Sequence, residues 1–377
     1  MSIFADLFGN VLNLNWQMVV MWIIGGILIY LAIKKDMEPT LLLPMGFGTI
    51  LVNIPLSGAI TQGAEEGALT TLFNAGIANE LFPLILFIGI GAMIDFTPVL
   101  SNPKLMIFGA AAQFGIFFTF CLAAMFFTPE EAASIGIIGA ADGPTAIVVA
   151  NKLIGADSEI TGAIMVAAYS YMALVPIIQP PVIKALTTKK ERLIRMDNSS
   201  VKVSKLTKIL FPIVVTIVAG IVAPSSVSLV GFLMFGNLIR ECGVLDSLSE
   251  TAQKVLANLI TIFLGITIAC QMHYDKFLRP STLLILGLGL FAFIFDTAGG
   301  VLFAKLLNLF LPKGKKMNPM IGAAGISAFP MSGRVVHKLG LAEDNQNFLL
   351  MHSIGVNVSG QIASVIAGGL ILNFFLK

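Results

Sequence analysis

The chain has 377 residues, of which 56% are hydrophobic and only 12% are charged, and its formal net charge is +2. Soluble domains have about a quarter charged residues, and a soluble core of this length could not bury so much apolar surface. The composition therefore predicts an all-α polytopic membrane protein. It argues against nucleic-acid binding, because no basic face exists outside the loops.

The first half of the chain contains apolar runs that are long enough to cross a membrane. The predicted spans are residues 17–33, 40–56, 81–97, 104–127 and 161–186. Residues 60–78 are too polar to span, and we expect them to form an amphipathic linker.

A basic linker separates this half from the next. Residues 184–208 contain eight Lys or Arg and two acids. We therefore divide the chain into a first transmembrane repeat at 1–186, a linker at 187–206 and a second transmembrane repeat at 207–377. The second repeat has predicted spans at 207–223, 226–240, 256–273, 281–311 and 348–374.

Each half also has one apolar stretch that glycine and proline interrupt. These stretches are residues 133–153 and 318–338, and both contain the sequence IGAA, at 138–141 and 321–324. The shared order of this and other short matches indicates an internal duplication of about five spans. Repeats with discontinuous segments near the membrane midplane are typical of transporters, because unwound backbone can bind ions there.

Charge predicts the orientation of the two repeats. The positive-inside rule places the linker 187–206 in the cytoplasm. Five spans per half then put Glu130 and Glu131 outside and the equivalent segment 313–316, rich in lysine, inside. This reversal is expected when an odd number of spans inverts the second repeat, although the basic residues of 273–279 fall outside. Both termini are predicted outside, and the two interrupted stretches are expected to meet at the midplane.

Asp142 is the acid of the first interrupted stretch, and Gly143, Pro144 and Thr145 follow it. Burying a carboxylate among apolar residues is costly, so an intramembrane acid indicates a functional site. A hard cation such as sodium prefers oxygen ligands, and a break at glycine and proline leaves carbonyl oxygens free. The alternative is a protonated or hydrogen-bonded structural Asp.

The second interrupted stretch has no acid but offers other polar groups. Asn318 and Ser327 can supply neutral oxygen ligands. Arg334 suits a carboxylate, either that of Asp142 or that of an anionic substrate, through its fork of donors. The alternative for Arg334 is a side chain that snorkels at the end of a span.

Weaker indications attach to other polar residues. Tyr169 and Tyr171 lie within a span, where a phenol needs a partner and could be a proton donor, an ion ligand or a structural group. Asp95 lies at the end of a span, where a solvated helix cap and a functional site are equally good explanations. Asn79 and Asn258 lie at the starts of spans and could face the interrupted stretches or simply cap helices. The sequence contains no cluster of transition-metal ligands.

Several long motifs resemble those of the membrane β subunits of the biotin-dependent, sodium-pumping decarboxylases. They include GAMIDFTPVLSNPK, IGIIGAADGPTAI, AAYSYMALVPIIQPP and NPMIGAAGISAFPM, and the resemblance runs along nearly the whole chain. Members of this family act on oxaloacetate, methylmalonyl-CoA or glutaconyl-CoA. The short segment before the first span is more similar to the acyl-CoA types.

The resemblance implies roles for individual residues. It identifies Asp142 as the essential acid and Tyr171 as a proton donor. The positions in the second interrupted stretch that match the family are Asn318, Gly322, Ser327 and Arg334. The first three of these are expected to bind sodium with Asp142, and the arginine is expected to hold the carboxylate of carboxybiotin. Asp95 and Ser364 match positions of lesser weight, and the role of Gln361 is left open.

The resemblance also implies a reaction and partners. The chain would decarboxylate carboxybiotin carried by a partner subunit, move Na+ outward and consume an external proton. The implied partners are a carboxyltransferase subunit, a biotin carrier subunit, a small membrane subunit and further copies of this chain, in the cell membrane of a prokaryote. No covalent cofactor is expected on this chain. Composition and repeats alone leave a stand-alone secondary sodium or proton transporter as a second hypothesis.

Overall fold

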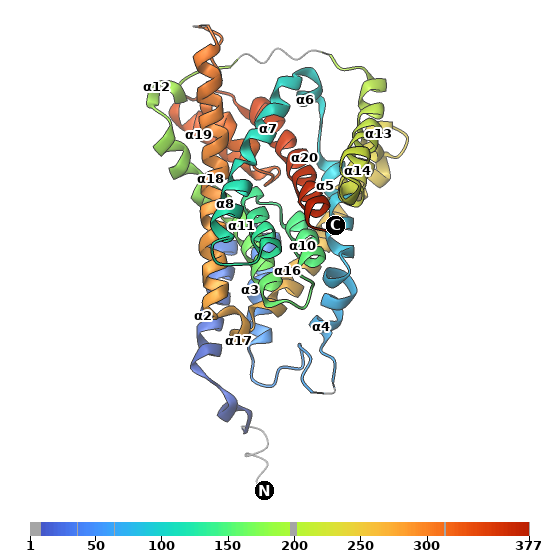
Figure 1. The fold of residues 1–377 in the computed structure, drawn as a ribbon, viewed down its shortest axis with the longest axis vertical. Coiled ribbons are helices and arrows are strands. Elements are labelled where there is room, and N and C mark those ends of the chain that lie inside the picture. The colour runs from blue at the N-terminus through green and yellow to red at the C-terminus, as the bar shows by residue number, and fades with distance from the viewer. Residues whose placement is uncertain (1–8, 36, 64, 197–201, 313, 377) are drawn as a thin grey trace.

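The computed structural model describes residues 9–35, 37–63, 65–196, 202–312 and 314–376, and these are built from helices (Figure 1). In these ranges there is no β-strand, only one isolated bridge between Gln62 and Glu65. Seven of the described helices are long and apolar enough to cross a membrane, or up to eight if one bent pair is a single span. The prediction of an all-α polytopic membrane protein is confirmed, while the inverted repeats stay a prediction.

The first half of the chain runs from a short 3₁₀-helix to the long helix α11. Its elements are η1 (Gly9–Asn13), α2 (Trp16–Lys35), α3 (Pro39–Val52), α4 (Ala68–Leu72), η2 (Phe73–Ala78), α5 (Leu81–Met93), α6 (Thr97–Ser101), η3 (Pro103–Leu105), α7 (Met106–Ala112), α8 (Phe114–Ala123), α9 (Pro129–Gly136), η4 (Ile137–Ala140), α10 (Gly143–Leu153) and α11 (Glu159–Leu186).

Two predictions for this half are wrong in part. The predicted span 40–56 is a helix of only 14 residues, which ends at Val52 and is shorter than a membrane crossing requires. The predicted amphipathic linker 60–78 is helical in its second part, where Ala68–Ala78 joins α5 at a bend of 63°. Glu80 takes a left-handed backbone conformation at this bend, and the neighbouring Asn79 caps it.

The second half begins after the linker. Its elements are α12 (Lys189–Arg192), α13 (Lys205–Val222), η5 (Pro224–Ser226), α14 (Val227–Cys242), α15 (Asp246–Thr251), η6 (Ala252–Leu256), α16 (Ala257–Ile268), η7 (Ala269–Met272), α17 (Tyr274–Phe277), α18 (Pro280–Phe310), η8 (Pro319–Gly325), α19 (Met331–Glu343) and α20 (Leu350–Phe375). The turns η2 and η6 are π-helical, and they precede α5 and α16 respectively. The internal duplication would pair these two spans, because the dipeptide Ala-Asn occurs at the start of each, at 78–79 and 257–258.

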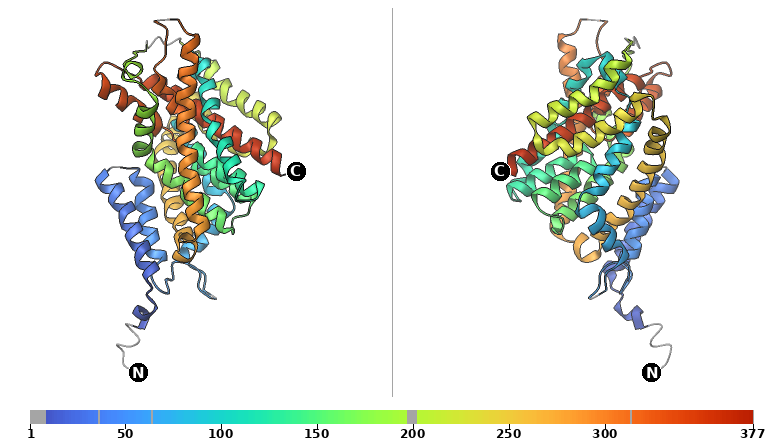
Figure 2. Two further views of the ribbon diagram at one scale, coloured as in Figure 1. Left: turned by 60° about the vertical axis from the view of Figure 1, so that its left-hand side comes forward. Right: turned by 90° about the vertical axis from the view of Figure 1, so that its right-hand side faces the viewer.

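The interrupted stretches lie at the centre of the helices. Figure 2 shows α18 running along nearly the full height of the molecule, with α2 and α3 side by side at its periphery. The elements α9, η4 and α10 pack against α18, α11 and α20, and their buried side chains form one apolar cluster. The breaks are therefore surrounded by protein, as unwound backbone at membrane depth requires.

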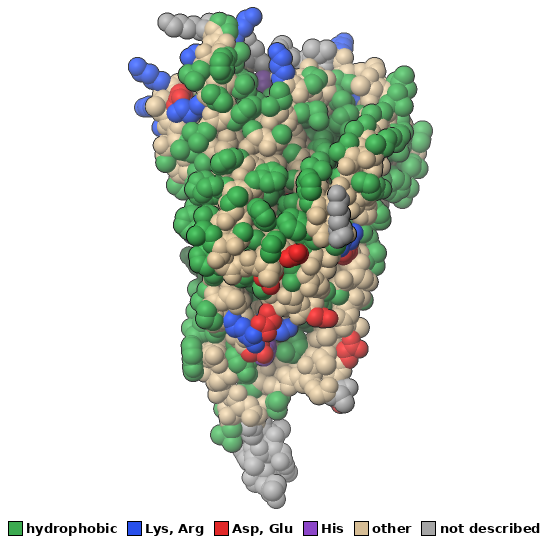
Figure 3. Space-filling model, in the orientation of Figure 1, with side chains coloured by type: hydrophobic (Ala, Val, Ile, Leu, Met, Phe, Trp, Pro, Cys, Tyr) green, Lys and Arg blue, Asp and Glu red, His purple; other side chains and the backbone are tan. Residues whose placement is uncertain are grey.

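The outer surface is suited to lipid. Figure 3 shows hydrophobic side chains over much of the upper and middle part of the visible face, with Lys and Arg gathered at the upper end and a second group of charged side chains below the centre. Many large apolar side chains are exposed, among them Ile221 and Phe310 at 77% and 80%. A water-soluble protein would not present so much apolar area, whereas hydrocarbon chains would cover it.

The linker docks on the second interrupted stretch at one end of the molecule, and η1 lies at the opposite end (Figure 1). Arg192 pairs with Glu343, and Arg195 pairs with Asp344, each at 2.7 Å. The Arg195 guanidinium beside Asp344 holds the pKa of that carboxyl below its usual value. Part of the predicted linker, residues 197–201, lies outside the described residues.

Candidate functional site

The first break is formed by a left-handed residue followed by a helix cap. The 3₁₀-helix η4 ends at Ala140, and its C-cap is Ala141, whose φ and ψ are 51° and 42°, a conformation that is costly for a residue with a Cβ atom. Asp142 is then the N-cap of α10, and its Oδ1 accepts a hydrogen bond from the Thr145 backbone N–H at 3.3 Å. Pro144 in the first turn of α10 suits a position without an intrahelical N–H bond.

Three side chains donate to the other oxygen of Asp142. Oδ2 accepts from the Thr145 hydroxyl at 2.7 Å, the Ser364 hydroxyl at 2.8 Å and the Gln361 amide at 3.1 Å. Asp142 is only 2% exposed. In the described ranges no Lys, Arg or His forms an ion pair with it, so its negative charge meets only neutral donors. Such a group requires a cation or a proton to balance the charge.

Helix α20 supplies two partners of Asp142, namely Ser364, which the resemblance named as a lesser candidate, and Gln361, whose role the sequence left open. Asn357, Gln361 and Ser364 are spaced i, i+4 and i+7, which places them on one face of a helix. The Asn357 amide donates to the Ile326 carbonyl at 2.7 Å, and its buried Oδ1 has no hydrogen-bond partner among the described residues. The polar stripe in an otherwise apolar span was the signal that could have identified them.

The two breaks are in direct contact. The Ser327 backbone N–H donates to the Ala140 carbonyl at 2.8 Å, so the second break bonds to the residue that precedes the left-handed turn of the first. The Ser327 hydroxyl donates to the Gly360 carbonyl of α20 at 3.1 Å. Breaks that lie about 185 residues apart in the chain thus form one junction, and α20 packs against both.

The two candidate tyrosines face different ways. The ring of Tyr169 lies against Gly143, where an added Cβ would be 2.4 Å from the Cε2 atom of the tyrosine. The Tyr169 hydroxyl is buried and bonds to no group in the part of the chain that the structure describes. The Tyr171 hydroxyl instead donates to the Leu286 carbonyl of α18. Residues two apart on a helix point to opposite sides, and Tyr171 packs in the apolar cluster that also contains Ile138 and Ala141 of the first break. The structure places Tyr169, not Tyr171, against the residue that follows Asp142.

Asn318 and Gly322 have contacts of a structural kind. The Asn318 amide donates to the carbonyls of Arg192 and Ile194 in the linker, each at 2.9 Å, and its oxygen accepts from the Met320 N–H. An added Cβ on Gly322 would lie 2.0 Å from the Gly300 carbonyl oxygen, so η8 crosses α18 backbone to backbone. In this conformation neither residue has a contact with Asp142 among the described interactions.

Arg334 lies in the first turn of α19, with its side chain exposed. No Asp or Glu in the described segments forms an ion pair with Arg334. The sequence left two possible partners for Arg334, Asp142 and an anionic substrate, and in this conformation Arg334 forms no ion pair with Asp142. The guanidinium is open to an anion that arrives from outside the chain.

The secondary candidates, Ser364 apart, lie at the ends of helices. Asp95 accepts from the Thr97 N–H at 2.9 Å and lies 3.9 Å from Arg240 of α14. Asn79 and Asn258 are exposed, the former at the bend before α5. In this conformation these three residues cap helix ends or lie on the surface.

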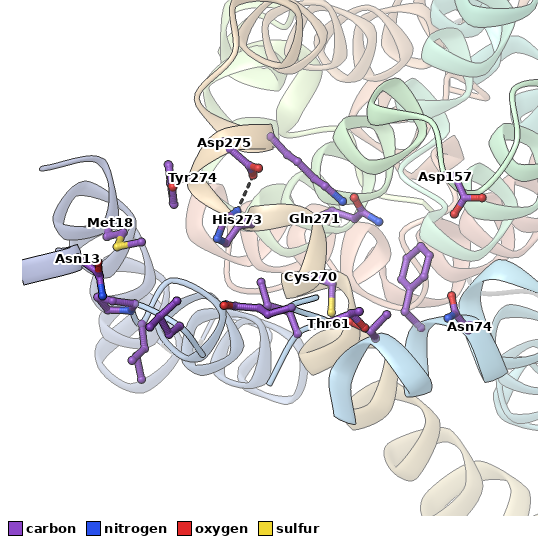
Figure 4. Close-up of a pocket in the computed structure, with 18 of the residues that line it drawn as sticks. Asn13, Met18, Thr61, Asn74, Asp157, Cys270, Gln271, His273, Tyr274 and Asp275 are labelled. Carbon is purple, nitrogen blue, oxygen red and sulfur yellow. Dashed lines mark hydrogen bonds and ion pairs between the residues drawn. The ribbon is translucent and has the colours of Figure 1, made fainter. Parts of the chain in front are cut away.

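A cavity of about 590 Å³ opens near η1 and α17, at the end of the molecule opposite the linker (Figure 4). Asp157, Gln271, Cys270 and the hydrogen-bonded pair of His273 and Asp275, 2.5 Å apart, are among its lining residues. An apolar cluster lies between this cavity and the first break. Phe73 lines the cavity and belongs to that cluster, which also contains Ile147, Met165, Tyr169 and Met272.

Comparison with known proteins gives consistent matches along the chain. The family model of the Na+-transporting oxaloacetate decarboxylase β subunit matches residues 17–375. The methylmalonyl-CoA decarboxylase β subunit of Veillonella parvula is 51% identical, with 94% of this chain and 92% of the relative covered. That of Propionigenium modestum is 47% identical, with 96% of each chain covered. The oxaloacetate decarboxylase β chain of Klebsiella pneumoniae is 44% identical, with 97% of each covered.

Proposed function

The chain belongs to the family of Na+-transporting oxaloacetate decarboxylase β subunits, and on this basis we propose that it decarboxylates carboxybiotin and couples that reaction to outward Na+ transport. The observation that carries the proposal is Asp142, a buried acid at the junction of two breaks whose partners are all neutral donors. A membrane anchor would not need a carboxyl group there. The relatives are decarboxylase subunits, which disfavours a stand-alone transporter.

Na+ as cargo would bind at Asp142. The carboxylate supplies charge, and the hydroxyl oxygens of Thr145 and Ser364 can turn their lone pairs to a cation, since both already lie within 2.8 Å of Oδ2. The unpartnered oxygens of Asn357 and Tyr169 are further ligands near the junction. A proton that reaches Asp142 makes it a neutral and poorer ligand, so proton entry would release Na+.

Carboxybiotin would bind at the second break from the linker side. The exposed guanidinium of Arg334 would hold its carboxylate through two parallel hydrogen bonds. Loss of CO2 breaks the N–C bond and leaves the electron pair on the ureido nitrogen, which must then receive a proton. We propose Tyr171 as the proton donor, and its hydroxyl would have to leave the Leu286 carbonyl to serve. Coupling then arises because Na+ binds one state of Asp142 more tightly than the other.

The direction of transport follows from the orientation. The basic linker would face the cytoplasm, so the cavity lined by Asp157 and His273 would open outside. We place the exit of Na+ and the entry of the proton at this cavity. The apolar cluster around Met165 and Tyr169 would close the path in the present conformation.

The proposed partners are a carboxyltransferase subunit, a biotin carrier subunit and a small membrane subunit, with further copies of this chain. The methylmalonyl-CoA decarboxylase β subunits are more identical to it, at 47% and 51%, than the oxaloacetate decarboxylase chain, at 44%. We therefore propose that the complex acts on an acyl-CoA. The choice of substrate resides in the carboxyltransferase.

The test is decarboxylation of free carboxybiotin by the purified chain in liposomes, with and without Na+ outside and inside. We expect CO2 release that requires Na+ on the linker side and accumulation of Na+ on the other side. CO2 release at the same rate without Na+, or release without Na+ movement, would contradict the proposal.

Arg334→Lys is expected to lower the rate of carboxybiotin decarboxylation by about 10- to 100-fold, because lysine keeps the charge but cannot bind a carboxylate with two parallel bonds. The measurement is the rate as a function of carboxybiotin concentration. Lys338→Ala, an exposed change one turn further along α19, is the matched control and should keep the parent rate. An Arg334→Lys enzyme with an unchanged rate would rule out bidentate binding.

The orientation can be tested at Cys270, one of three free cysteines and the one that lines the cavity. In a variant with Cys121 and Cys242 changed to serine, a membrane-impermeant maleimide should label Cys270 in intact cells. Ser204→Cys in the linker region should be labelled only after the membrane is opened. Labelling of both positions from the same side would show the orientation to be wrong.

A further inference from the structure

A second acid, Asp296, is buried within the membrane-spanning region and has no part in the proposed function. It lies near the middle of the 31-residue helix α18 and is 0% exposed. The sequence places it in the apolar run FAFIFDTAGGVLF, within the predicted span 281–311. Acids within membrane spans are rare and usually functional, so its surroundings need an explanation.

The two carboxyl oxygens of Asp296 have different surroundings. Oδ1 accepts a hydrogen bond at 3.1 Å from the Ile116 N–H in the first turn of α8, where the span α7–α8 is interrupted at Gln113. Gly115 lets the acid approach, since an added Cβ there would be 2.2 Å from Oδ1. Oδ2 has no hydrogen-bond partner among the described residues.

The unpartnered oxygen faces the first break. An added Cβ on Gly139 would lie 2.9 Å from Oδ2, so this oxygen rests against the backbone of η4. Gly139 comes three residues before Asp142, and its neighbour Ala140 accepts the bond from Ser327 of the second break. Asp296 therefore contacts the junction through η4, separately from the hydroxyl and amide donors on Asp142.

No charge balances a carboxylate at this place. The elements α7, η4 and η8 carry no ionisable side chain. The ionisable side chains on the other elements packed against α18 are Cys121, Glu130, Glu131, Glu159, Tyr169, Tyr171, Lys184, Tyr274, Asp275 and Lys276. In the described part of the chain none of these is hydrogen bonded or ion paired to Asp296.

A proton is the ligand that fits Asp296. The N-terminal N–H groups of α8 favour negative charge, but this effect is smaller than the cost of removing a carboxylate from water. A sodium ion would need several oxygen ligands, and in the described residues no hydroxyl or amide group is hydrogen bonded to Oδ2 to contribute one. A proton on Oδ2 removes the charge without any further ligand.

We propose that Asp296 is a second ion-binding carboxyl group of this chain, which carries a proton behind the first break while Asp142 serves Na+. The inference deepens the proposed function, because decarboxylation consumes a proton and the membrane-spanning part needs a group that can hold it. Loss of the proton would leave a bare negative oxygen against η4 and would favour a rearrangement of the first break. The site thereby links proton binding to the junction that holds Asp142.

Infrared spectroscopy of the purified chain tests the protonation without any pumping assay. At neutral pH we expect a carbonyl band of a neutral carboxylic acid that is lost in Asp296→Asn and kept in Asp246→Asn, an exposed control. A carboxylic-acid band that is unchanged by Asp296→Asn would mean that Asp296 is ionised and would overturn the proposal. If Asp296→Asn does not fold, Asp296→Glu should shift the band, and an unshifted band has the same meaning.

The second test uses the reconstituted complex. Asparagine at position 296 still accepts from the Ile116 N–H, so we expect Na+ binding within about twofold of the parent. Na+ transport should fall at least tenfold, with a flattened dependence on external pH. Thr297→Val, a buried neighbour, should keep the parent pH profile. If Asp296→Asn transports Na+ at the parent rate with the parent pH profile, the proposal is overturned and the role of Asp296 is only to cap α8. If the variant loses Na+ binding, the proposal is also overturned, and Asp296 belongs to the sodium site.

Discussion

Replacement of Asp142 by asparagine is expected to lower both Na+-dependent decarboxylation and Na+ transport at least ~100-fold, since losing a carboxylate–cation contact in a low-dielectric site costs several kcal/mol. The change removes one charge and little else. The amide oxygen of asparagine can still accept from the hydroxyls of Thr145 and Ser364, so the first break should keep its shape. The measurement is Na+ uptake and CO2 release by the reconstituted complex.

A matched set of variants makes the result specific to the charge at this position. Asp246→Asn removes an acid from the surface and should leave both rates unchanged. Gln361→Leu removes the amide donor to Oδ2 but keeps the carboxylate, so we expect weaker discrimination of Na+ with turnover retained at saturating Na+. Coupled pumping by Asp142→Asn at the parent rate would remove this acid from the mechanism.

Gly322→Ala is expected to lower the stability of the folded chain by about 3 kcal/mol or more, because a Cβ atom would lie 2.0 Å from the Gly300 carbonyl oxygen. The reciprocal change Gly300→Ala should be equally severe, since its Cβ would lie 2.0 Å from the Gly322 carbonyl oxygen. Thermal unfolding in detergent is the measurement, with a loss of roughly 5–10 °C or more for each variant.

This comparison separates packing from sodium binding at Gly322. Gly287→Ala lies on the same helix as Gly300, has no atom within 4 Å of the added Cβ and should unfold at the parent temperature. If Gly322→Ala folded normally and lost only its response to Na+, the crossing of η8 and α18 would not be the reason for this glycine. Equal losses of stability at both glycines would assign the pair to helix packing.

Sequence alone located the first break and its acid with little ambiguity. Asp142 stands out because a carboxylate in an apolar run has few explanations, and the motifs around it identify the family. The spans were also readable from composition, because lipid requires long apolar helices. Where the helix was short, as in α3, or bent, as at α4 and α5, hydropathy gave the wrong boundary.

The sequence did not indicate which side chains from distant segments contact the first break. Gln361 and Ser364 lie more than 200 residues from Asp142, and nothing local to either segment indicates that α20 packs on the first break. Which of Tyr169 and Tyr171 lies against Gly143 depends on the rotation of α11 about its axis, and the helices packed around α11 fix that rotation. Asn318 illustrates the converse, because its contacts to the linker through the amide nitrogen could not be read from the sequence, whereas its oxygen, the atom that could bind a cation, accepts from the Met320 N–H in this conformation.

The sequence by itself thus determined the membrane class, the family, and the two breaks with their one acid, because each rests on local composition or on a continuous motif. Only the tertiary structure decided which side chains surround that acid, that the breaks bond to each other through Ser327 and Ala140, and that Asp296 lies behind them. The physical reason is that a helix presents a different residue every 100° of rotation. Packing against other helices, and not the sequence of one span, selects the face that is buried at the site.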